Sequence, residues 1–168
     1  MKCQNWLLLI FVFYYESFII HFVIMRLLAL DIGQKRTGIA VTDPLQILCQ
    51  PLDYVPTHTL MAWLQAYFLK EAVVAIIIGM PMQPSGEASS NTPLVIGWVR
   101  KLRKTFADKE VVEHDEKYTT IMAHRVILQS GISKIARQEK GLADKVSAAL
   151  ILQSYLERRE LGQNRNQI

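Results

Sequence analysis

The apolar and polar positions along the chain fall into short runs that predict strands. Residues 26–31 and 37–42 are apolar runs separated by a glycine-bearing turn, which predicts an antiparallel hairpin. A third strand is expected at residues 48–55, and a fifth at residues 110–114. Between them, the β-branched run at residues 73–78 is typical of a strand buried on both faces.

Helical spacing of apolar residues marks the segments between and after these strands. Amphipathic helices are predicted over residues 59–70 and 92–106, the latter beginning with a Thr-Pro pair. Two further helices are expected over residues 119–130 and 142–160, followed by a flexible polar tail at residues 161–168. The order of elements predicts an α/β fold in which a mixed five-stranded sheet carries helices on both faces.

The N-terminal residues 6–25 are almost wholly apolar and allow three interpretations. A signal peptide lacks its cleavage site, because the first alanine of the chain is Ala29. A membrane anchor is long enough by hydropathy, but it would join the first strand without a linker. We expect instead that Met25 is the true start, that residues 1–24 are an upstream extension, and that residues 25–160 form a single domain.

Composition limits the class of protein. A chain of 168 residues suits one domain with a sizeable core. The net charge of +4 and the sequence pI near 9.1 are compatible with a nucleic-acid partner. Cys3 and Cys49 lie far apart and form no CxxC pair, so neither a disulfide scaffold nor a zinc site is supported. A reducing, cytoplasmic compartment is expected.

A single carboxylate, Asp31, stands at the end of the first predicted strand. The turn that follows contains Gly33, Lys35 and Arg36. A carboxylate at the edge of an apolar core is costly unless a partner compensates its charge. The partner of Asp31 is therefore either these two cations or a metal ion.

Other acids also stand at the ends of predicted elements. Asp115 and Glu116 end the fifth strand, where alternation sends them to opposite faces, so only one is expected to join a shared site. Asp144 begins the last helix. Each acid alone fits a turn or helix-cap role, but their joint occurrence at element ends favours a common site.

Four motifs that contain these acids follow one another along the chain. They are Asp31-x-Gly33-x-Lys35-Arg36-x-Gly38-x-Ala40, Gly79-x-Pro81 with Gly86, His114-Asp115-Glu116-Lys117-x-Thr119-Thr120, and Asp144-x-x-Ser147-Ala148-Ala149. The ordered set resembles the bacterial Holliday-junction resolvase-like family, also described as the pre-16S rRNA nuclease family. The resemblance covers residues 25–157 and implies a ribonuclease H-like fold.

The resemblance implies roles for particular residues. Catalysis and metal binding fall to Asp31, Glu116 and Asp144, which would hold Mg²⁺ or Mn²⁺, expected as two ions. Contacts to substrate phosphates are implied for Lys35, Arg36, Lys117, Thr119 and Thr120. A loop near the site is implied for Gly79, Pro81 and Gly86.

This chain departs from the family pattern at two positions. Lys117 stands where the family usually has arginine, which loses the bidentate hydrogen-bonding fork. Ser147 stands where classical junction resolvases carry a second acid, which weakens a junction-resolving interpretation. A non-catalytic role for His114 and His124 is expected, because their spacing to the acids is not that of metal ligands.

The function implied is metal-dependent phosphodiester hydrolysis at the 5′ end of pre-16S rRNA, in ribosome biogenesis. A branched-DNA endonuclease is the alternative enzyme, and a non-catalytic RNA-binding assembly factor is the alternative of another class. The expected partner is nucleic acid, RNA in the leading interpretation, with no stable membrane association. A monomer and a homodimer both remain open.

Four cations crowd the predicted helix at residues 92–106. Arg100, Lys101, Arg103 and Lys104 form either a solvated helix face or a nucleic-acid footprint. Trp63 and Trp98 lie on apolar stripes, which favours core positions over base-stacking platforms.

Overall fold

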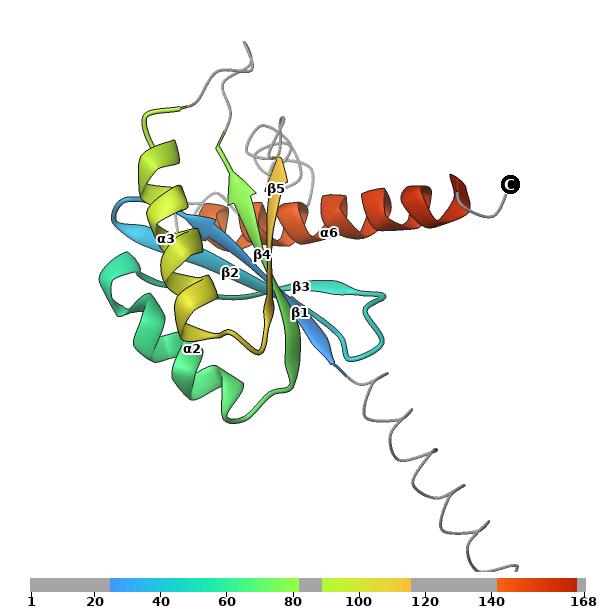
Figure 1. Cartoon of the computed structure of the whole chain (residues 1–168), viewed down its shortest axis with the longest axis horizontal. Coiled ribbons are helices and arrows are strands. Elements are labelled where there is room, and N and C mark those ends of the chain that lie inside the picture. Colours follow the sequence, from blue (N-terminus) through green and yellow to red (C-terminus); the bar gives the residue numbers. More distant parts are fainter. Residues whose placement is uncertain (1–24, 82–88, 116–141, 166–168) are drawn as a thin grey trace, which may run out of the picture.

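The fold is built on one mixed sheet of five strands in the order β3-β2-β1-β4-β5 (Figure 1). The computed structural model describes residues 25–81, 89–115 and 142–165. β1 pairs antiparallel with β2 and β2 with β3, whereas β1–β4 and β4–β5 are parallel. The strands are β1 (Arg26–Ile32), β2 (Arg36–Thr42), β3 (Cys49–Pro56), β4 (Val73–Met80) and β5 (Glu110–Asp115). The predicted hairpin start and mixed sheet are confirmed.

The described helices lie on both faces of this sheet (Figure 1). The 3₁₀ turn η1 (Thr57–Thr59) leads into α2 (Leu60–Phe68), which packs with α3 (Thr92–Thr105) on one face. The long helix α6 (Leu142–Arg165) crosses the other face and continues past the end predicted at residue 160. The helix predicted at residues 119–130 lies outside the described residues.

Strand alternation gives the two faces different side chains. On the α2/α3 face, β1 presents the large residues Leu28 and Leu30, both fully buried. On the α6 face, small residues dominate, among them Ala29 of β1 and Ala40 of β2, packed against Ala148 of α6. Because these side chains are small, the backbone of α6 can approach the sheet closely. Among the described helices, none is both long and apolar enough to cross a bilayer.

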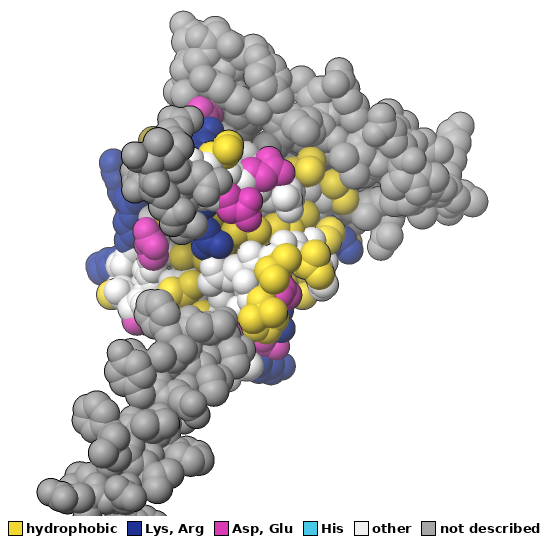
Figure 2. Space-filling view, turned by 90° about the vertical axis from the view of Figure 1, so that its right-hand side faces the viewer, with side chains coloured by type: hydrophobic (Ala, Val, Ile, Leu, Met, Phe, Trp, Pro, Cys, Tyr) yellow, Lys and Arg dark blue, Asp and Glu magenta, His cyan; other side chains and the backbone are white. Residues whose placement is uncertain are grey.

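One loop exposes apolar side chains at the end of the sheet away from Asp31. Leu45, Ile47 and Leu48, between β2 and β3, are exposed. Figure 2 shows hydrophobic side chains gathered on this side of the molecule. In the same loop, Gln46 donates a hydrogen bond to the carbonyl of Met25, 2.8 Å away, which fixes the loop beside the start of β1.

We predict that Leu28→Ala lowers the free energy of unfolding by about 2–5 kcal/mol, because the substitution leaves a cavity in a closed core. Leu69→Ala is the matched control, since Leu69 is 89% exposed and the same change there costs less than about 0.5 kcal/mol. Urea denaturation of both variants measures the difference. Equal losses would contradict this assignment of the core.

Candidate active site

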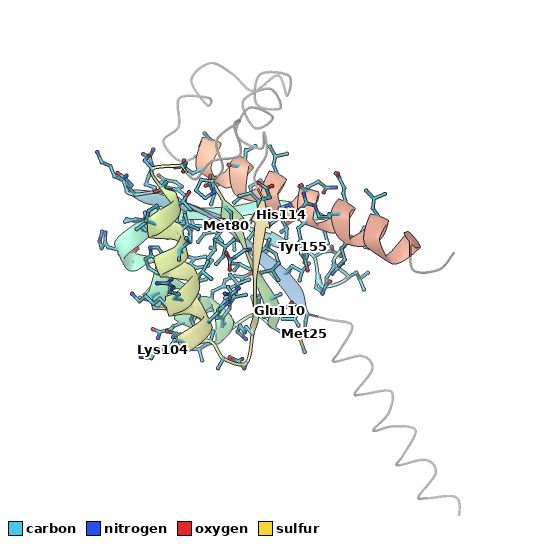
Figure 3. All side chains as sticks on the ribbon, turned by 45° about the horizontal axis from the view of Figure 1, so that its top comes forward. Met25, Met80, Lys104, Glu110, His114 and Tyr155 are labelled. Carbon is cyan, nitrogen blue, oxygen red and sulfur yellow. The ribbon has the colours of Figure 1, made fainter. Side chains whose placement is uncertain are left out.

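The candidate site lies at the carboxyl ends of the parallel strands. Met80 of β4 and His114 of β5 lie toward this edge, and Glu110 toward the opposite one (Figure 3). Asp31 is near the end of β1, and alternation puts it on the α6 face together with Leu27 and Ala29. The predicted position of Asp31, at the end of a buried strand, is thus confirmed.

A close backbone contact brings the start of α6 to Asp31. Gly38 of β2 is the cross-strand partner of Asp31. A Cβ added at Gly38 would lie 1.9 Å from the carbonyl oxygen of Asp144, which no side chain can tolerate. The first turn of α6 therefore rests on the bare backbone of Gly38, directly beside Asp31.

The Asp31 carboxyl is held in an environment that disfavours its charge. Burial raises its pKa above the ordinary value, the hydroxyl of the buried Ser147 lowers it, and the negative charge of Asp144 raises it further. Two carboxylates from separate elements thus repel one another at one point. A cation bound between them would relieve this repulsion.

Arg36 pairs with Asp144 and not with Asp31. Its Nε lies 3.0 Å from Asp144 Oδ2, and both side chains are partly exposed. Arg36 is held there by the turn from β1 to β2, in which the Gly33 amide donates to the Arg36 carbonyl at 2.9 Å. Lys35 is exposed in the same turn. The sequence offered Arg36 as one possible partner of Asp31, but in the structure Arg36 pairs with Asp144.

Asn91 is a polar residue of this region that sequence reasoning did not single out. Its side-chain Nδ2 donates to the carbonyl of Ile32 at 2.7 Å, one residue after Asp31. The next residue, Thr92, donates from its hydroxyl to the carbonyl of Pro81 at 2.9 Å. The start of α3 is thereby tied to the ends of β1 and β4. The one signal in the sequence was the position of Asn91, directly before the Thr-Pro helix start.

The end of β5 separates its polar residues between the two faces. His114 is buried on the α6 face, with Nε2 3.0 Å from the Ser154 hydroxyl. Burial lowers its pKa, and the positive charge of Arg158 adds to this effect. Glu113 instead pairs with Arg103 of α3 at 3.0 Å. Alternation therefore assigns Asp115 to the α3 face, away from Asp31.

The structure brings together only part of the predicted site. Asp31, Arg36 and Asp144 meet, and Gly79 and Pro81 lie at the end of the neighbouring strand β4. Over residues 25–81, 89–115 and 142–165 there is no group of three acidic, histidine or cysteine side chains that could hold a metal ion. The predicted residues Glu116, Lys117, Thr119, Thr120 and Gly86 lie outside the described residues.

Comparison with known proteins identifies the family. Residues 25–158 match the model of the RuvX family, described as a Holliday junction resolvase. The chain belongs to the RuvX family. Two curated relatives carry the name "Putative pre-16S rRNA nuclease". The protein of Flavobacterium johnsoniae is 47% identical over 131 residues, covering 78% of this chain and 95% of its own. That of Bacteroides fragilis is 46% identical over 136 residues, covering 81% and 99%.

A solved structure supports the fold of this RuvX-family chain. The Holliday junction resolvase of fowlpox virus matches with a TM-score of 0.51 at 15% identity, over 80% of this chain and 99% of the viral one. At this identity the likeness concerns the fold alone. It confirms the expected ribonuclease H-like architecture.

We predict that Gly38→Ala destabilises the protein by about 1–3 kcal/mol, the range for overpacking, because the new methyl group must displace the first turn of α6. Gly162→Ala is the matched control, since an added Cβ there meets nothing within 4 Å. Chemical denaturation measures both changes. An unaltered stability in Gly38→Ala would contradict the contact with Asp144.

We predict that Asp31→Asn stabilises the metal-free protein at neutral pH. The pKa of Asp31 is higher in the folded protein than its unfolded value of 3.8. The protonated side chain therefore stabilises the fold below pH 3.8, and this stabilisation is lost as the pH rises through the folded-state pKa. The advantage of the variant therefore disappears toward pH 4. Urea denaturation in a chelating buffer measures it across this range.

Asp43→Asn is a comparison variant for which we expect the opposite change in stability. Backbone amides, that of Leu48 first, hold the pKa of Asp43 below its usual range. The Asp43 variant should therefore be less stable than the parent above about pH 4, and the difference should vanish in acid. Destabilisation by Asp31→Asn at neutral pH would contradict the electrostatics described here.

Proposed function

We propose that this RuvX-family protein is a divalent-metal-dependent nuclease that trims the 5′ end of pre-16S rRNA in the cytoplasm. The observation that carries the proposal is the juxtaposition of Asp31 and Asp144. These two acids are far apart in sequence but lie side by side in the structure. Burial and mutual repulsion both raise the free-energy cost of ionising Asp31. Structural acids are normally paired or exposed, so a cost of this kind favours a functional role.

The donor set of the site fits a hard divalent cation. Asp31, Asp144 and Glu116 would hold Mg²⁺ or Mn²⁺, which prefer carboxylate oxygens, and we expect two ions. Glu116 is proposed as the third ligand because the motif His114-Asp115-Glu116-Lys117 resembles that of the family. Bound there, the metal would supply an activated water and charge stabilisation for an in-line displacement at phosphorus.

The protein's own groups orient the substrate and control charge. Ser147 lies buried next to Asp31, and its hydroxyl lowers the pKa of that carboxyl. Arg36 compensates Asp144 while no other cation is bound. We assign Arg36 and Lys35 to a substrate phosphate, since both are at least partly exposed beside the acids. Lys117, Thr119 and Thr120 are proposed for the same role, and Gly79, Pro81 and Gly86 for the adjoining loop.

The choice of RNA over branched DNA rests on the names of the relatives. The match to this chain covers nearly the whole length of each relative. The family description favours a Holliday junction as the second candidate substrate. Ser147, a hydroxyl in the place of the further acid of classical junction resolvases, argues for RNA.

We predict that Asp31→Asn, Glu116→Gln and Asp144→Asn each reduce cleavage at least about a hundredfold, equivalent to about 2.7 kcal/mol of transition-state stabilisation. The assay uses purified protein, a pre-16S 5′-leader RNA and a four-way DNA junction, with Mg²⁺ or Mn²⁺. Asp108→Asn is the control, because Asp108 is 73% exposed and pairs only with Lys109 in the described structure.

The outcomes separate the candidates. Cleavage of the RNA that depends on all three acids supports the proposal. Cleavage of the DNA junction but not of the RNA would make branched DNA the substrate. Full activity in all three variants would contradict the mechanism, and RNA binding without any cleavage would favour the assembly-factor alternative.

A further inference from the structure

We infer that the outward face of α3 is a binding surface for single-stranded RNA, with one base stacked on Trp98 and the phosphates on Lys101 and Lys104. The inference rests on the proposed function, because it assigns to α3 the strand that leads to the cleavage site. It concerns residues that the candidate active site does not use.

The charge of α3 is entirely positive. The helix carries Arg100, Lys101, Arg103 and Lys104, and its sequence from Thr92 to Thr105 contains no acid. Arg103 is engaged with Glu113 and with the Val111 carbonyl on β5. The other three cations are exposed. Exposed cations without nearby acids on their helix suit the phosphate backbone of a nucleic acid.

A hollow beside Trp98 lies on the same face. It has a volume of about 300 Å³ and is lined by Pro93, Leu94, Gly97, Trp98 and Lys101. The core position expected for Trp98 from the sequence is met only in part, because its side chain is partly buried against the core and partly exposed. The Lys101 ammonium lies over its ring, 4.7 Å from the centre, so a flexible, exposed lysine covers this ring face and a base would stack there by displacing it. A partly exposed indole flanked by cations suits the stacking of a nucleobase.

Gly97 strengthens this interpretation because packing does not explain it. Glycine in a helix interior is unfavourable relative to alanine. Yet a Cβ added at Gly97 would meet nothing within 4 Å, so no neighbour requires the missing side chain. What the glycine does provide is the floor of the hollow beside Trp98.

The position of α3 connects this surface to the acids. Asn91, directly before the helix, is bonded to Ile32 next to Asp31. From there the helix runs along the sheet to Lys104, which lies far from Met80 and the site edge (Figure 3). A strand bound along α3 therefore has one end at the edge of the sheet where β1 ends, from which it would continue around that edge to the acids on the α6 face. Gly97 and Lys104 are about 10 Å apart along the helix axis.

The charge contribution is tested by the double variant Lys101→Gln/Lys104→Gln. Its matched control is Lys70→Gln/Arg158→Gln, which changes two exposed cations outside α3 and gives the same change in net charge. The probe is a fluorescein-labelled twelve-nucleotide uridine RNA, titrated by anisotropy in EDTA at several salt concentrations. We expect the α3 variant to weaken binding and to lower the salt slope by about 1.4, or 0.7 for each lost phosphate contact. Equal effects of the two double variants would overturn the inference.

The stacking contribution is tested by Trp98→Leu and Gly97→Leu. Each should weaken RNA binding by about fivefold or more, the effect of losing one stacked base. Trp63→Leu is the matched control, since Trp63 also packs partly against the core, from α2. Gly97→Leu should also keep or raise the Tm, which separates lost binding from lost folding. Unchanged affinity in Gly97→Leu would overturn the stacking assignment.

These outcomes are distinguishable from failure of the proposed function, because binding is measured in EDTA without cleavage. α3-dependent RNA binding supports the surface even if the three acids prove dispensable for cleavage. Conversely, acid-dependent cleavage with α3-independent binding overturns the surface and leaves the nuclease intact. Weakened binding of a four-way DNA junction with unchanged RNA binding would overturn RNA as the occupant.

Discussion

The candidate site depends on one steric constraint, the contact between the backbone of Gly38 and the carbonyl of Asp144. No other residue type fits at position 38 while α6 keeps this distance from the sheet. Because Gly38 is paired with Asp31 across the hairpin, the contact also fixes the separation of the two acids. The distance between the two acids is therefore set by backbone packing, against their mutual repulsion.

Other features of the fold are consequences of this close approach. Small side chains line the α6 face, with Ala29 and Ala40 opposite Ala148, whereas large aliphatic side chains fill the face under α2 and α3. The approach also leaves Asp31 partly buried next to another carboxylate, which raises its pKa. Arg36 offsets this cost only for Asp144, and only at the solvent-exposed rim. The fold thus gives up some stability at the point where we propose that a divalent cation binds.

The sequence predicted the elements well because their signals are local. The glycine-bearing turn after Asp31, the β-branched run of β4 and the Thr-Pro start of α3 all occur in the structure as expected. The ion pair between Arg36 and Asp144 could not be predicted from local sequence signals. The two residues are 108 positions apart, and only the packing of α6 brings them together. Asn91 was missed for a similar reason, since its bond to Ile32 depends on how α3 docks.

The central claim is that Asp31 and Asp144 form one divalent-cation site. Isothermal titration calorimetry with Mn²⁺ tests it most directly, on the parent protein, Asp31→Asn, Asp144→Asn and the exposed control Asp108→Asn. The account predicts saturable binding that each site variant weakens at least about tenfold, or about 1.4 kcal/mol, while the control retains it. Unchanged Mn²⁺ affinity in both site variants would contradict the account.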